Sequence, residues 1–326
     1  MKTNWFCSLK NEEFSSLIFK NEGGDGLFCV GREGVQSIYA LKDNKVEFIN
    51  YSDKTLAYIK SSMGYPAIYP MHATVFEPPA KAVLMDLDGT SIKSEKFWIW
   101  IIQKTTAILL DNPKFELEDE DEPFVSGNSV SEHLKYCINK YCPEKTVEEA
   151  RQIYYQICDY ELNEIMEGRG RVNAFEPMPG LKEFLLELKA RDIKIGLVTS
   201  GLYKKAWPEI AAAFRTMNLG CPADFYDAII TAGFALIKGQ AGTLGELEPK
   251  PHPWLFAETA RVGLGIDISD RNKVIGLEDS SAGIVSIRLA GFCALGVEGG
   301  NIKENGAQSL CRNMHEGLVT VLQDII

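Results

Sequence analysis

The chain has 326 residues, of which 45% are hydrophobic and 24% are charged, and its formal net charge at pH 7 is −11. A chain of this length is too long for one typical hydrophobic core, so about two or three domains are expected. The negative charge argues against a protein that binds the nucleic-acid backbone. No apolar run approaches the roughly 18 residues of a membrane span, and the first residues lack the apolar stretch of a secretory signal. The eight cysteines are scattered without a C-x-x-C pair, which is typical of reduced thiols in a cytoplasmic protein.

Residues 1–80 alternate Gly-rich turns with short strand-like runs, such as 27–30 and 45–49. One short helix is expected over 52–63, with Ser52 as its N-cap. We interpret the whole stretch as an α+β N-terminal extension. It would cover the core, join subunits or contact substrate.

The first chemically informative stretch is the apolar run 82–85, which leads directly into Asp86 and Asp88 and then into Gly89-Thr90. Such a run is typical of a parallel strand buried on both faces. Ligands of open α/β sheets bind at the carboxyl ends of these strands. Two carboxylates crowded there repel each other unless a cation holds them, and their hard oxygen atoms suit Mg²⁺. The alternative is an Asp-Gly turn that ends a core strand.

A block of helices follows this strand. Helical patterns cover 96–110, 129–140 and 146–166. The acidic stretch 116–122 between them is expected to be a solvated face. The block 94–176 is therefore predicted to be a separate helical unit.

Two further segments carry candidate functional groups. The apolar run 193–198 ends in Thr199, Ser200 and Gly201, whose hydroxyl and amide groups suit recognition of a phosphoryl oxygen. The alternative is a cap on the helix that begins at about residue 202. Farther on, Lys250 lies between two prolines that fix its backbone, so its ammonium group can be aimed with little entropic loss. The alternative is an exposed lysine in a proline-rich loop.

A fourth segment, the strand-like run 273–277, ends in Glu278 and Asp279 and leads into a helix. Alternating strands and helices with short turns predict a doubly wound parallel α/β sheet. The carboxyl ends of its strands meet at one edge, so six residues are expected to converge there: Asp86, Asp88, Thr199, Lys250, Glu278 and Asp279.

These four segments resemble, in order, the four motifs of the haloacid dehalogenase superfamily, most of whose members are Mg²⁺-dependent phosphatases. The sequences Asp-Gly-Thr-x-x-x-Ser-Glu, Lys-Pro-His-Pro and Glu-Asp-Ser-x-Ala-Gly-Ile are similar to its phosphoglycolate phosphatase and β-phosphoglucomutase branch. The resemblance implies a catalytic core of residues 81–93 and 177–326 with a helical cap domain of residues 94–176. It also implies that residues 232–248 are an insertion near the site, because the family is usually shorter there.

The resemblance further implies roles for individual residues. Asp86 would be the nucleophile and Asp88 the general acid and base. Thr199, Ser200 and Gly201 would hold a phosphoryl oxygen, and Lys250 would stabilise negative charge. Mg²⁺ would be held by Asp86, Asp88, Glu278 and Asp279. Gly127 and Asn128 resemble the substrate-specificity loop of the branch; the alternative is a turn before the next helix.

We therefore predict a phosphatase that uses Mg²⁺ and an aspartyl-phosphate to hydrolyse a small phosphorylated metabolite. One alternative is a β-phosphoglucomutase-like enzyme, which returns the phosphoryl group to another hydroxyl. Another is a non-catalytic binding module with the same fold. Such modules usually lose the nucleophile or the lysine, and this sequence retains both Asp86 and Lys250.

Overall fold

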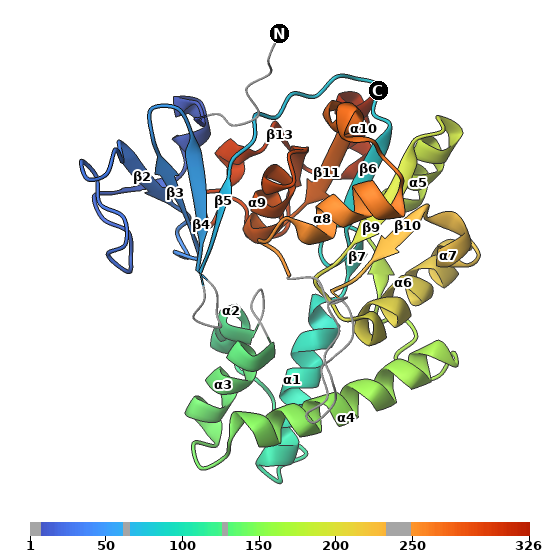
Figure 1. Ribbon diagram of the computed structural model, residues 1–326. Coiled ribbons are helices and arrows are strands. Elements are labelled where there is room, and N and C mark those ends of the chain that lie inside the picture. Colours follow the sequence, from blue (N-terminus) through green and yellow to red (C-terminus); the bar gives the residue numbers. More distant parts are fainter. Residues whose placement is uncertain (1–7, 61–65, 126–129, 233–248) are drawn as a thin grey trace. The chain divides into compact units, whose positions relative to one another are not determined.

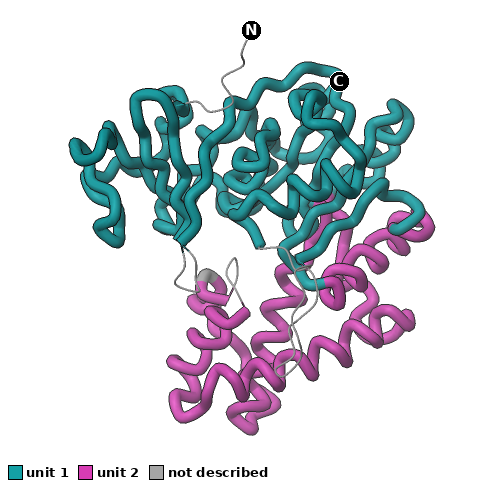
Figure 2. The backbone as a smooth tube through the Cα atoms, in the orientation of Figure 1, with its two compact units in different colours: residues 1–90, 179–202, 223–326 teal, residues 91–178, 203–222 magenta. Residues whose placement is uncertain are grey.

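The structure is a computed structural model, and it describes residues 8–60, 66–125, 130–232 and 249–326. The chain divides into two compact units (Figure 2). The first comprises residues 1–90, 179–202 and 223–326, and the second comprises residues 91–178 and 203–222. In the described parts of both units, no helix is long and apolar enough to cross a bilayer.

The first unit contains a six-stranded parallel sheet with the strand order β10-β9-β6-β11-β12-β13. The strands are β6 (Ala82–Asp86), β9 (Lys194–Val198), β10 (Ala228–Ile230), β11 (Val274–Glu278), β12 (Cys293–Val297) and β13 (Asn313–His315). Every residue of β6, β11 and β12 is buried, as expected of strands covered on both faces. The predicted doubly wound α/β class is confirmed.

Helices join these strands. They are α5 (Leu181–Ala190), α7 (Pro222–Phe225), α8 (Trp254–Glu258), α9 (Ser281–Leu289) and α10 (Leu318–Ile325). Helix α9 begins directly after β11, and the Ser280 side chain accepts a hydrogen bond from the Gly283 amide as its N-cap. The α9 N-terminus therefore lies at the carboxyl end of β11.

The N-terminal extension forms a five-stranded antiparallel sheet instead of the expected mixture of strands and a helix. Its strands are β1 (Ile18–Lys20), β2 (Ser37–Ala40), β3 (Val46–Asn50), β4 (Thr55–Ile59) and β5 (Ala67–Pro70), in sequential order. The predicted helix over 52–63 is wrong, because its central residues form β4 and pair with β3 and β5. Residues such as Thr55, Tyr58 and Ile59 suit a strand between two neighbours. The expected strand at 27–30 is reduced to an isolated bridge at Cys29.

This extension packs on the parallel-sheet part of the first unit (Figure 1) and shares a hydrophobic cluster with it. The shared cluster joins Phe14, Phe48 and Met71 of the extension with residues of α8 and α9, including Phe256. A partly buried ion pair adds to the contact, because Arg288 of α9 lies 2.6 Å from Glu13. The N-terminal sheet is thus built into the first unit.

The second unit is helical. It contains α1 (Glu95–Leu109), α2 (Glu122–Val125), α3 (Val130–Tyr141), α4 (Val147–Met166), α6 (Tyr203–Met217) and a short hairpin of β7 (Ile92–Lys93) with β8 (Glu176–Pro177). Helix α1 contacts α3 and α4, and α4 contacts α6. The prediction that residues 116–122 form a solvated face is wrong for Asp121, which is fully buried. Its side-chain partners come from α3, and charge patterning along the chain does not reveal them.

Candidate active site

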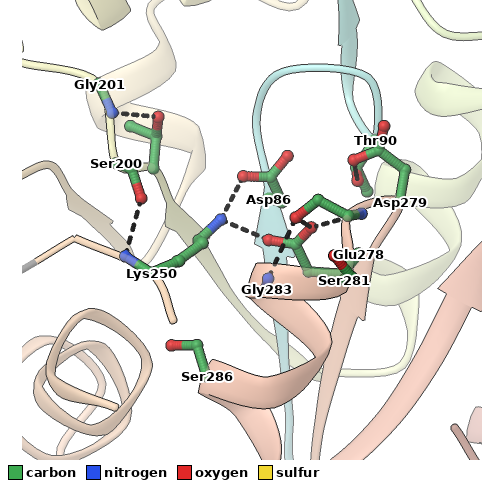
Figure 3. Close-up of polar contacts among 12 residues, drawn as sticks. Asp86, Thr90, Ser200, Gly201, Lys250, Glu278, Asp279, Ser281, Gly283 and Ser286 are labelled. Carbon is green, nitrogen blue, oxygen red and sulfur yellow. Dashed lines mark hydrogen bonds and ion pairs between the residues drawn. The ribbon is translucent and has the colours of Figure 1, made fainter. Parts of the chain in front are cut away.

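The candidate site lies at the carboxyl edge of the central strands of the parallel sheet (Figure 3). Strand β6 lies between β9 and β11, with Asp86 level with Val198 and Met85 level with Leu277. The residues that end these strands therefore leave the sheet side by side. Asp86 and Glu278 are both buried there.

Lys250 connects two of these acids. Its Nζ atom forms ion pairs with the Asp86 carboxylate and with Oε1 of Glu278, the latter at 2.5 Å. Burial opposes a charge on this lysine, but the two carboxylates outweigh burial and raise the pKa of Lys250 above its ordinary value. The Lys250 amide also donates a hydrogen bond of 3.1 Å to Oγ of Ser200. The site thus holds a buried, charged ammonium group between two acids.

The acids outnumber this single cation. One oxygen atom from each of Asp86, Glu278 and Asp279 lies within 4.8 Å of the other two. Burial, together with the charge of Glu278, raises the pKa of Asp86 well above its usual range. The same two causes raise the pKa of Asp279 to about 7. Three hard oxygen donors with uncompensated negative charge fit a divalent cation such as Mg²⁺.

Three glycines make room for the acidic side chains. A Cβ atom on Gly283 would lie 1.9 Å from the Glu278 carboxylate, and one on Gly89 would lie 2.1 Å from the Asp279 carboxylate. Gly89 also has a φ of +82°, which favours glycine. A Cβ on Gly300 would lie 2.4 Å from Oδ2 of Asp279. Sequence reasoning missed Gly300, and the only signal was a pair of glycines after the next strand.

Two hydroxyl groups that the sequence did not single out support the acids. Thr90 donates a hydrogen bond of 3.2 Å to Oδ1 of Asp279. Ser280 donates to Oε2 of Glu278 from its amide at 3.0 Å and from its hydroxyl at 2.8 Å. Because Oε1 of Glu278 binds Lys250, both oxygens of this carboxylate have partners. Glu278 therefore serves to hold the lysine as well as to add negative charge.

The other predicted site residues are placed as follows. Asp88 is half-buried in the turn after β6, and its charge contributes to the raised pKa of Asp86. Thr199 is buried directly after β9, and its Oγ1 accepts a hydrogen bond of 2.9 Å from the Gly201 amide. Ser200 is exposed. Gly127 and Asn128 lie outside the described residues, so their assignment as substrate contacts stays a prediction, as do the catalytic roles of the others.

Comparison with known proteins relates this geometry to a family. A family model described as haloacid dehalogenase-like hydrolase matches residues 80–291. No curated protein sequence matches the chain. Similar solved structures include a predicted phosphoglycolate phosphatase from Haemophilus somnus, with 21% identity, a TM-score of 0.57 and coverage of 76% of this chain and 99% of that chain. A β-phosphoglucomutase from Clostridium difficile has 23% identity and a TM-score of 0.51, covering 76% of this chain and 96% of that one.

A third similar structure is CbbY from Rhodobacter sphaeroides in complex with phosphate, with 17% identity, a TM-score of 0.52 and coverage of 74% of this chain and 96% of that chain. Likenesses at these identities show a shared fold. The family match covers more than half of the 326 residues and includes every described residue of the acidic site. The chain belongs to the haloacid dehalogenase-like hydrolase family.

Proposed function

We propose that this protein is a phosphatase that uses Mg²⁺ and an aspartyl-phosphate to hydrolyse a small phosphorylated metabolite. The observation that carries the proposal is the buried Lys250 ammonium group, which pairs with Asp86 and Glu278 beside Asp279. A site for a phosphate dianion needs positive charge next to its nucleophile. The family match and the phosphate bound by the related CbbY structure support the same chemistry.

Electrostatics explains why an aspartate alone would not suffice. A carboxylate that approaches a phosphate dianion at about 4 Å is repelled by roughly 4 kcal/mol per pair of unit charges at an effective dielectric constant near 20. Lys250 offsets part of this repulsion at both the nucleophile and the phosphate. When bound, Mg²⁺ would supply the remaining positive charge. The carboxylates of Asp86 and Asp279 and the backbone carbonyl of Asp88 would hold the ion, and Glu278 would contribute directly or through water.

The proposed reaction has two steps. In the first, an Asp86 oxygen forms a bond to phosphorus as the ester P–O bond breaks, and Asp88 gives a proton to the leaving oxygen. In the second, Asp88 takes a proton from the water that attacks phosphorus, and the bond to Asp86 breaks to release inorganic phosphate. Thr199, Ser200 and Gly201 would hold a phosphoryl oxygen through their hydroxyl and amide groups.

The competing reaction is phosphoryl transfer to a second hydroxyl. We consider it because one of the similar structures is a β-phosphoglucomutase. The two reactions share the first step and differ in the acceptor. Incubation with β-glucose 1-phosphate separates them, because a mutase yields an isomerised sugar phosphate with little free phosphate. A phosphatase yields inorganic phosphate.

The test is hydrolysis of p-nitrophenyl phosphate in the presence of Mg²⁺. Asp86→Asn should lower kcat by at least about a thousandfold, because an amide cannot act as the nucleophile. Asp121→Asn is a matched control, since Asp121 is a buried aspartate in the helical unit. It should retain kcat within about twofold, as expected for a group that does not enter the chemistry. Equal activity of wild type and Asp86→Asn would remove Asp86 from its assigned role.

A further inference from the structure

The N-terminal sheet contacts the loop that carries Lys250. Tyr69 belongs to β5, and its hydroxyl oxygen lies 2.9 Å from Nδ1 of His252, with which it shares a hydrogen bond. The two rings meet edge to face, with centroids 5.8 Å apart and planes at 80°. Tyr69 also meets the ring of Trp254, at 6.4 Å and 73°. Because His252 is two residues from Lys250, this contact reaches the immediate neighbourhood of the site.

Two other elements hold the same loop. The hydroxyl of Ser286 in α9 donates a hydrogen bond of 2.6 Å to the His252 carbonyl. The Lys250 amide donates to Oγ of Ser200, which follows β9. Figure 3 shows the contact between Ser200 and the Lys250 amide. These two contacts come from inside the family match, whereas Tyr69 lies outside it. The loop is thus held from β9, from α9 and from the N-terminal sheet.

We propose that Tyr69 is a positioning residue, and that the N-terminal sheet fixes the Lys250 ammonium group through the His252 ring. A lysine side chain has many rotamers, and its charge interaction with Asp86 and with a bound phosphate weakens with distance. A fixed loop backbone limits where Nζ can lie. The extension would then complete the charge arrangement of the site in addition to covering the core. The role of the Lys250 ammonium group in binding a phosphate rests on the proposed function.

The experiment measures oxyanion binding, so that it does not depend on turnover. Tungstate, a dianion similar to phosphate, is titrated calorimetrically into the full chain in the presence of Mg²⁺. The stoichiometry reports the fraction of binding-competent protein, and Kd reports the quality of the site. Tyr69→Phe should weaken tungstate binding by about three- to tenfold with unchanged stoichiometry, which is the range expected for the loss of one hydrogen bond.

The matched control is Tyr39→Phe. Tyr39 lies in β2 of the same sheet and stacks on Phe14, with ring centroids 4.3 Å apart. Removal of its hydroxyl group should leave Kd unchanged. Thermal unfolding of both variants shows whether they remain equally folded.

A double-mutant cycle tests the route through the histidine. If Tyr69 acts through His252, then Tyr69→Phe should have no further effect on Kd in a His252→Ala background. Wild-type affinity of Tyr69→Phe, or an effect that persists in the His252→Ala background, would overturn the proposal. Weakened tungstate binding by Tyr69→Phe in a protein that hydrolyses no phosphate ester would instead support the positioning role and refute the proposed function.

Discussion

Asp86 and Asp121 are both buried aspartates that pair with a lysine, yet their surroundings shift their pKa values in opposite directions. Asp121 accepts hydrogen bonds from Lys140 at 2.6 Å, from the Tyr136 hydroxyl at 2.7 Å and from the Glu118 amide at 2.8 Å, and it also accepts one from the Tyr141 hydroxyl. Burial raises the pKa of Asp121, but these donors together outweigh burial and lower it to about 2. This carboxylate is fully satisfied by its own unit.

At the carboxyl edge of the parallel sheet the balance is reversed. One lysine faces Asp86 and Glu278, with Asp279 close by, and burial raises the pKa values of Asp86 and Asp279. In the metal-free protein protons relieve this excess of negative charge, as the raised pKa values express, and a bound cation would relieve it instead. The donors around Asp121 therefore neutralise its charge within the fold, whereas the Asp86 cluster keeps an excess of negative charge of the kind that a divalent-cation site has.

Replacement of each lysine by methionine should separate the two clusters most sharply. In the proposed mechanism Lys250 offsets the repulsion between Asp86 and a phosphate, so Lys250→Met should lower kcat for p-nitrophenyl phosphate by roughly a hundred- to a thousandfold. Lys140→Met should change kcat by less than about twofold, because Glu118 and Asp121, with which Lys140 pairs, both lie in the helical unit. A Lys250→Met enzyme that keeps more than about a tenth of the wild-type kcat would show that charge compensation at this site does not depend on the lysine.

A Cβ atom added at a glycine beside the acids tests how tightly their side chains are held. In Gly283→Ala, the new Cβ would lie 1.9 Å from the Glu278 carboxylate, so the acid must move and Lys250 loses one partner. We expect kcat to fall by about tenfold or more, since small displacements of catalytic groups are costly. Gly317→Ala is the control, because its Cβ would meet nothing within 4 Å. Equal kcat values for the two variants would mean that the acids relax without loss.

The sequence predicted the part of the site that follows from strand ends. The apolar runs before Asp86, before Thr199 and before Glu278 indicate buried parallel strands, and parallel strands place their carboxyl ends at one edge. The order of β6, β9 and β11 at that edge agrees with this reasoning. The apolar runs are local in the sequence, and the rules of parallel-sheet topology predict that the residues after them meet at one edge.

Features that depend on distant partners could not be predicted in this way. The burial of Asp121 depends on donors from Tyr136, Lys140 and Tyr141, so an acidic run alone suggests a solvated face. Strand β4 depends on pairing with β3 and β5, whereas Ser52 considered locally suggests a helix cap. The contact between Tyr69 and His252 joins residues 183 positions apart, and no periodic pattern reports it.

The pH dependence of stability should have opposite signs for the two clusters. In the metal-free protein, the raised pKa values of Asp86 and Asp279 mean that the folded state binds protons more tightly than the unfolded state. Stability from Asp279 is therefore present below about pH 4, the usual range of an aspartate, and is lost as pH rises to about 7. Measured in a chelator, the melting temperature should fall between pH 5 and pH 8, and added Mg²⁺ should restore it most at pH 8.

Asp279→Asn provides the control for this pH dependence. It should reduce the pH dependence of the metal-free melting temperature without abolishing it, since Asp279 no longer titrates and Asp86 still does. It should also weaken the stabilisation by Mg²⁺. A wild-type melting temperature that is equally high at pH 5 and pH 8 in chelator would contradict the excess of negative charge inferred for this cluster.

Asp121→Asn should have the smallest effect and the opposite pH dependence. Because the pKa of Asp121 is lowered to about 2 from an ordinary value of 3.8, its stabilisation is present above about pH 4 and is lost as pH falls towards 2. The amide keeps the shape but loses the charge, so the free energy of unfolding at pH 7 should fall by about 1–2 kcal/mol, with the contribution of the part-exposed Lys140 reduced by solvent screening. Urea unfolding, followed by tryptophan fluorescence, measures this difference, since three of the five tryptophans (Trp98, Trp100 and Trp207) lie in the helical unit. The difference should vanish near pH 2, and a constant difference between pH 7 and pH 2 would mean that the charge of Asp121 does not stabilise the helical unit.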